Sequence, residues 1–122
     1  MELQYIFNEL KDILKKYEGI LSFKKNEEGY YDLWSVKDIV IDGRKRKEVF
    51  FAGLIIQKSY VGFYFMPIYT DTDLKEIFKP ELLKLLKGKS CFHIKKLDDE
   101  LKRQIEEALE IGYELYKKDE WI

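Results

Sequence analysis

Cysteine and histidine are almost missing from this chain of 122 residues, which contains one of each. A single cysteine cannot form a disulfide within the chain, and it is typical of a reducing compartment. The first residues, MELQYIFNELKD, include acids and no long apolar run, so they do not predict a secretory signal peptide. These features together predict a cytoplasmic protein.

Long apolar runs and an excess of charge are also missing. No stretch approaches the ~18 uncharged apolar residues that a membrane-spanning helix requires. The 22 lysines and arginines are balanced by 23 acids, and the concentrated basic segment, Gly43 to Lys47, is short. Since a duplex binder needs a basic face and this segment fits a solvated hairpin turn, we expect neither a nucleic acid nor a membrane as partner.

Aromatic residues, by contrast, are abundant. They make up 16% of a chain that is 46% hydrophobic and 37% charged, which is a globular composition with a charged exterior. The length suits one domain, over residues 1–122. Because a small core rarely needs so many rings, we expect some of them on a surface available for binding.

Hydrophobic periodicity indicates helices at both ends and strands between them. Apolar residues three and four apart predict a first helix over 3–17, and a last helix is predicted over 98–118, with short helices expected after Thr70 and Pro80. Strands are expected over 20–23, 31–41 (with a break near Lys37 and Asp38 as an alternative), 48–57, 60–68 and 90–95. This order predicts an α+β two-layer sandwich, in which an antiparallel sheet of about five strands has the terminal helices packed on one face.

The hairpin across Lys58 and Ser59 predicts the two faces of this sheet. An even-length turn there gives one wholly apolar face that must lie under the helices: Phe50, Ala52, Leu54, Ile56, Val61, Phe63, Phe65 and Pro67. The other face is mixed: Phe51, Gly53, Ile55, Gln57, Tyr60, Gly62, Tyr64 and Met66. Strand glycines permit close approach of a ligand, so we expect a shallow hollow walled by rings; bulges, twist or covering loops would equally explain the glycines.

Cys91 and His93 are two residues apart on the last strand, so they share the face of the hollow, which Trp34 and Asp32 join if the second strand alternates in the same way. A thiolate–imidazolium pair is one reading, but no orienting group or oxyanion donor is evident. A structural zinc site needs four ligands, and Cys91 and His93 supply only two; a partial metal site completed by Asp32 or Tyr64 is the alternative. Phosphate loops, a nucleophile elbow and HExxH are absent. We therefore expect no enzyme activity and no catalytic residue.

Three carboxylates form a row at helical spacing on the last helix. Glu106, Glu110 and Glu114 follow one another at intervals of four residues, away from the apolar stripe. Like charges so placed repel, and a hard cation or ferrous iron relieves the repulsion. A solvated helix face is the favoured explanation of the row, because Lys102 and Lys118 extend it at both ends.

Two segments carry a family resemblance: FFAGLIIQKSYVGFYFMP, from Phe50 to Pro67, and GKSCFHIKK with the helix that follows it. They resemble the YdhG-like domain family, small bacterial domains of largely unassigned function. The resemblance implies a frataxin-like α+β sandwich, and it implies iron binding and delivery as one possible role. The first helix interleaves its acids with lysines, which departs from the dense acidic ridge of frataxins.

The sequence thus favours a binding domain without enzyme activity and without a required cofactor. Its ligand, or a partner protein, is expected on the open sheet face formed by Trp34, Phe51, Gly53, Gly62, Tyr64, Met66, Cys91 and His93. An iron chaperone that uses Glu106, Glu110 and Glu114 is the second hypothesis, and a cysteine-dependent enzyme is the third. The same aromatic face could instead form a homodimer.

Overall fold

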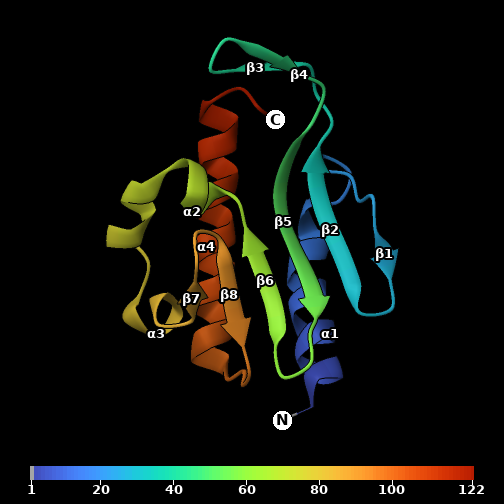
Figure 1. Cartoon of the computed structure of the whole chain (residues 1–122), viewed down its shortest axis with the longest axis vertical. Coiled ribbons are helices and arrows are strands. Elements are labelled where there is room, and N and C mark those ends of the chain that lie inside the picture. Colours follow the sequence, from blue (N-terminus) through green and yellow to red (C-terminus); the bar gives the residue numbers. More distant parts are fainter. Residues whose placement is uncertain (1) are drawn as a thin grey trace.

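The computed structural model describes residues 2–122, and it shows the α+β architecture (Figure 1). Helices open and close the chain, and an antiparallel sheet lies between them. The elements in chain order are α1 (Leu3–Leu14), a 3-10 turn (Lys15–Tyr17), β1 (Asn26–Glu27), β2 (Tyr30–Ser35), β3 (Ile39–Ile41), β4 (Arg44–Arg46), β5 (Val49–Ile56), β6 (Val61–Phe65), α2 (Pro67–Thr70), a 3-10 turn (Thr72–Glu76), α3 (Pro80–Leu83), β7 (Leu86–Lys87), β8 (Cys91–Ile94) and α4 (Asp99–Lys118).

The main sheet has six antiparallel strands in the order β1-β2-β5-β6-β8-β7. Strands β3 and β4 form a separate hairpin that projects beyond one end of the sheet (Figure 1). Its turn, Asp42-Gly43, has both residues at positive φ, 51° and 77°, which is the conformation that a tight two-residue hairpin requires. The basic residues from Arg44 to Arg46 therefore lie on a strand of this hairpin.

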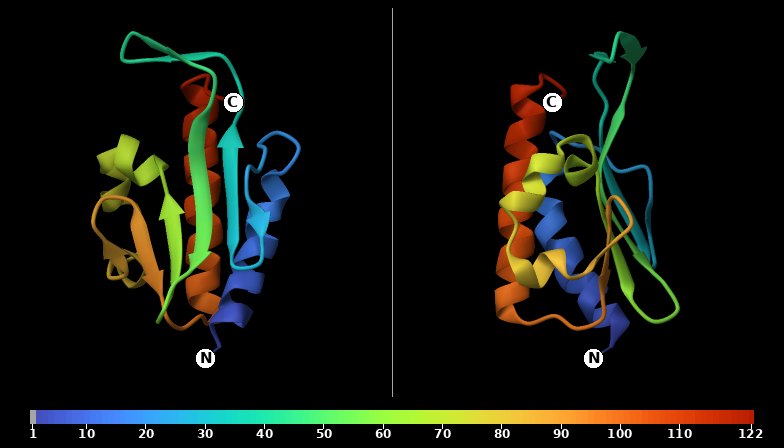
Figure 2. Two further views of the ribbon diagram at one scale, coloured as in Figure 1. Left: turned by 45° about the vertical axis from the view of Figure 1, so that its right-hand side comes forward. Right: turned by 60° about the vertical axis from the view of Figure 1, so that its left-hand side comes forward.

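The two terminal helices cover one face of the sheet, and the other face has no helix over it in residues 2–122 (Figure 2). The α1 side chains at spacings of three and four are buried against the sheet, including Ile6, Leu10 and Leu14. Helix α4 begins where the Asp98 side chain accepts a hydrogen bond from the Leu101 backbone N–H at 2.8 Å. The apolar core lies between these two layers.

The pairing of β5 with β6 confirms the register expected across Lys58 and Ser59. Gly53 pairs with Tyr64, Leu54 with Phe63, and Ile55 with Gly62. Leu54 and Phe63 are fully buried under the helices.

A β-bulge changes this alternation at the start of β5. On β2, Leu33 pairs with Ala52 and the next residue, Trp34, pairs with Phe50, so Phe51 has no partner across the ladder. Phe51 therefore turns inward together with Ala52, and it is 0% exposed. The predictions that Phe51 lies on the open face and Phe50 under the helices are wrong, because the extra residue reverses the parity of every position before it.

Some predicted boundaries also differ. Residues 20–23 form isolated bridges rather than a strand, and the edge strand is Asn26–Glu27. Strand β6 ends at Phe65, where Pro67 begins the short helix α2. The helix predicted from Pro80 ends at Leu83, and Leu86 and Lys87 form β7.

Candidate functional site

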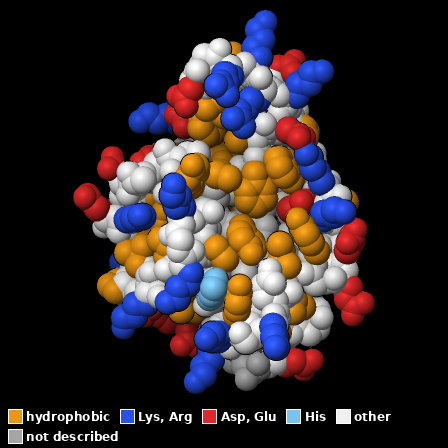
Figure 3. All heavy atoms as spheres, viewed as in Figure 1, with side chains coloured by type: hydrophobic (Ala, Val, Ile, Leu, Met, Phe, Trp, Pro, Cys, Tyr) orange, Lys and Arg blue, Asp and Glu red, His pale blue; other side chains and the backbone are white. Residues whose placement is uncertain are grey.

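The open face of the sheet brings together side chains from four strands that are far apart in sequence. Apolar side chains gather over its middle, and charged side chains of both signs surround them (Figure 3). The strand register arranges the face in rows: Asp32, Gly53, Tyr64 and Cys91 form one row, and Tyr30, Ile55, Gly62 and His93 form the next. Seven of the eight residues predicted for this face lie on it or in the grooves along it, and Phe51 does not.

The two strand glycines are covered by rings of the chain itself. A Cβ atom placed on Gly53 would lie 3.1 Å from Cζ of Phe50, and one on Gly62 would lie 2.8 Å from Cε2 of Tyr64. Larger residues would push these rings away, so the glycines let the Phe50 and Tyr64 rings lie close to the sheet. The glycines were expected to let a ligand approach the sheet closely, but in the structure the chain's own aromatic rings occupy that space.

A hollow of about 270 Å³ remains between these rings. Its walls come from β2, β5, β6 and the residues beside them: Tyr30, Asp32, Phe50, Gly53, Ile55, Tyr64, Met66 and Ser90. The predicted walls Tyr64 and Met66 are in place, and Phe50 replaces Phe51 as the third wall.

Asp32 supplies a buried carboxylate to this hollow. It is 5% exposed, and its Oδ1 accepts hydrogen bonds from the backbone N–H groups of Lys24 at 2.8 Å and Lys25 at 2.9 Å. These bonds tie the segment before β1 to the sheet. Alternation along the second strand placed Asp32 on this face, but nothing in the sequence indicated that it would be buried there.

A larger groove of about 820 Å³ continues from the hollow toward the β3–β4 hairpin and shares Phe50 and Met66 with it. Trp34 lines this groove, with its ring 5.2 Å from that of Phe50 in an edge-to-face arrangement. The Lys24 ammonium lies 3.9 Å from the centre of the Trp34 ring and pairs with Glu48. The indole N–H of Trp34 is buried and has no hydrogen-bond partner within residues 2–122.

Cys91 and His93 lie on the same face but use different partners. The His93 ring stacks on Tyr60, with centroids 3.7 Å apart and planes at 11°. The Cys91 side chain forms a hydrogen bond with Tyr64. Burial raises the pKa of the Cys91 thiol above its ordinary value, and the hydrogen bond from Tyr64 lowers that pKa by less. A thiol with a raised pKa is a poor nucleophile at neutral pH.

Alkylation of Cys91 by iodoacetamide is expected to be several-fold slower at neutral pH than alkylation of an unstructured cysteine, because only the thiolate reacts. Tyr64→Phe is expected to slow it further, since the hydrogen bond from Tyr64 lowers the thiol pKa. Mass spectrometry of the reaction across a pH series checks both results. An inflection below that of a free cysteine would contradict them and would favour an activated thiol.

The three carboxylates of α4 are each engaged separately. Glu106 lies 3.8 Å from the Lys16 ammonium, Glu110 accepts a hydrogen bond from the Tyr17 hydroxyl at 2.8 Å, and Glu114 lies 3.8 Å from Lys117. Among residues 2–122, no three acids, histidines or cysteines are grouped closely enough to hold a metal ion.

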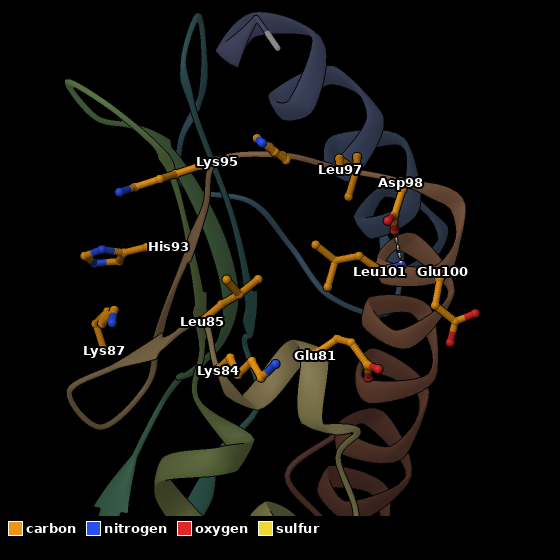
Figure 4. Close-up of a pocket in the computed structure, with 11 residues that line it drawn as sticks. Glu81, Lys84, Leu85, Lys87, His93, Lys95, Leu97, Asp98, Glu100 and Leu101 are labelled. Carbon is orange, nitrogen blue, oxygen red and sulfur yellow. Dashed lines mark hydrogen bonds between the residues drawn. The ribbon is translucent and has the colours of Figure 1, made fainter.

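A second cavity, of about 700 Å³, lies beside the edge strand β7 and the end of β8, near the start of α4 (Figure 4). Figure 4 shows Leu85 and Leu101 on the helix side of β8, whereas His93 and Lys95 project to the other side. The acids of this cavity already have partners, since Glu81 and Glu100 accept from Gln104 and Asp98 caps α4. The charged residues that line it are all exposed, whereas Asp32 in the hollow is buried.

Comparisons with protein families, with curated proteins and with solved structures find no match to this chain. The resemblance to the YdhG-like domain family therefore stays a prediction. In the part of the chain that the structure describes, no helix is both long enough and apolar enough to cross a bilayer.

Proposed function

We propose that this chain is a binding domain, without enzyme activity of its own, that takes a small-molecule ligand on the open face of its sheet. The observation that carries the proposal is the hollow of about 270 Å³, walled by three rings and a thioether and containing a buried carboxylate. Ligand sites are typically concave and apolar with a few placed polar groups, and this hollow has that character.

The rest of the face supports the same role. The larger groove shares Phe50 and Met66 with the hollow, so a ligand anchored in the hollow has room to extend toward the β3–β4 hairpin. The raised pKa of Cys91 and the stacking of His93 on Tyr60 favour binding over thiol chemistry. A small occupant is preferred to a partner protein, because the hollow is the size of a side chain rather than of an interface.

Tyr64→Ala is expected to weaken capture of a neutral fluorescent probe, N-phenyl-1-naphthylamine, at least about tenfold, because it removes one wall of the hollow. The free energy of unfolding should change by only about 1 kcal/mol, since Tyr64 is half-buried. Probe fluorescence and urea denaturation measure the two effects.

Tyr5→Ala is the matched control, because Tyr5 is an exposed ring on α1, in the other layer. It should leave probe capture unchanged. Equal capture by wild type and Tyr64→Ala would reject the proposal. Gel filtration of the wild type tests the competing occupant: a dimer that dissociates when the probe is added would show that a second copy covers the face.

A further inference from the structure

We infer that the hollow selects an organic cation, such as an alkylammonium group, with Asp32 as its counter-charge. This inference rests on the proposed function and names the chemical class of the ligand. It starts from an imbalance at Asp32. Asp32 is 5% exposed, yet the hydrogen bonds made to its carboxylate come from backbone N–H groups rather than from a lysine or arginine side chain.

Buried carboxylates in proteins are usually paired with a cation or bound to a metal. Within residues 2–122, Asp32 forms no salt bridge, and both backbone bonds fall on Oδ1. Asp32 also lines the hollow, so a ligand placed there meets this carboxylate. A positively charged group would complete the pairing that the chain itself leaves unmade.

The walls of the hollow suit a cation as well. Tyr30, Phe50 and Tyr64 present aromatic rings, whose faces attract ammonium groups, and an enclosure of several rings is a common way to bind them. Ile55 and Met66 add apolar contact for the carbon atoms of an alkylammonium group. Several rings and one carboxylate favour an organic cation over a bare metal ion, because a metal ion would need more oxygen ligands than the hollow supplies.

The lysines around the face repel a cation bound in the hollow only weakly. One of them, Lys24, is paired with Glu48 and lies over the ring of Trp34, which lines the larger groove. Exposed charges farther away are screened by salt over ~8–10 Å. Asp32 is therefore the charge that dominates inside the hollow.

Three probes of nearly the same shape separate charge from shape: choline, its uncharged carbon analogue 3,3-dimethylbutan-1-ol, and the anion 3,3-dimethylbutanoate. Titration into the full chain, followed by NMR at the Gly53 amide and the Trp34 indole N–H, is expected to show choline binding at least about tenfold more tightly than the alcohol. The anion should bind most weakly.

Asp32→Asn keeps an Oδ1 acceptor for the Lys24 and Lys25 N–H groups and removes the charge, so it should reduce the preference for choline over the alcohol to less than about twofold. Glu48→Gln is the matched control, because it removes a carboxylate from the larger groove rather than from the hollow, and the preference should survive. Thermal unfolding checks that both variants fold.

Each outcome separates the two proposals. Equal binding of choline and the alcohol at Gly53 would overturn the cation inference and leave the binding domain standing. A choline preference that survives Asp32→Asn would assign the selectivity to other groups and would also overturn it. If no probe shifts these signals, the inference fails, and capture of N-phenyl-1-naphthylamine alone decides the proposed function. The wild-type comparison stands even if Asp32→Asn does not fold.

Discussion

Phe51→Ala is expected to lower the free energy of unfolding by about 3–5 kcal/mol, and Phe50→Ala by only about 1 kcal/mol. The two residues are neighbours of the same type, but the bulge sends them to opposite faces. The Phe51 ring is fully buried and meets the rings of Tyr17, Phe65, Tyr113 and Tyr116, with centroids 5.2 to 6.5 Å apart. Removing it leaves a cavity that these packed side chains cannot fill.

Urea denaturation of the two variants beside the wild type measures the difference, and Phe50→Ala serves as the matched control because its composition is identical. The slope of the unfolding curves should be unchanged, so that the midpoints report stability directly. A larger loss for Phe50→Ala would contradict the bulge and would restore the uninterrupted alternation predicted from the sequence.

The order of elements and the hairpin register were predictable, because both depend on local chemistry. Alternation around Lys58 and Ser59 leaves one register that buries Leu54 and Phe63, and slipping it by one residue would expose them. The shared face of Cys91 and His93 follows from the same period of two.

The bulge could not be predicted, because Phe50 and Phe51 are chemically identical and either can be buried. What decides between them is the packing of Phe51 against Tyr113 and Tyr116, which come from the other end of the chain. Likewise, the burial of Asp32 depends on backbone N–H groups of Lys24 and Lys25. No periodicity along one strand reports such contacts between distant segments.

The strand glycines were correctly predicted to mark close approach to the sheet, but the groups that make the approach were not predicted. Gly53 and Gly62 do mark close approach to the sheet, as expected. The sequence could not show that the Phe50 and Tyr64 rings would make that approach, because alternation along a strand reports the face of a side chain and not its rotamer. The hollow therefore lies among the rings, and its polar group comes from Asp32 on the adjacent strand.

Gly112→Ala is expected to destabilise the chain by about 2 kcal/mol, although alanine normally stabilises a helix interior by ~1 kcal/mol relative to glycine. A Cβ atom at this position of α4 would lie 2.5 Å from Cζ of Phe65 and 2.8 Å from Cγ of Pro67. Phe65 is fully buried and proline is rigid, so neither can move aside cheaply. Helix α4 would have to lift from the sheet.

Thermal and urea unfolding measure this effect, and a double-mutant cycle assigns its cause. Phe65→Leu removes the far end of the ring but leaves the contact with Pro67, so the cost of Gly112→Ala should become smaller without vanishing in the Phe65→Leu background. An additive cycle, or a gain in stability from Gly112→Ala alone, would contradict the close contact.

Met66 lies between Phe65 and Pro67, the two residues nearest to Gly112, and its side chain lines the hollow on the opposite face of the sheet. The distance between α4 and the sheet therefore also sets the position of one wall of the proposed binding site.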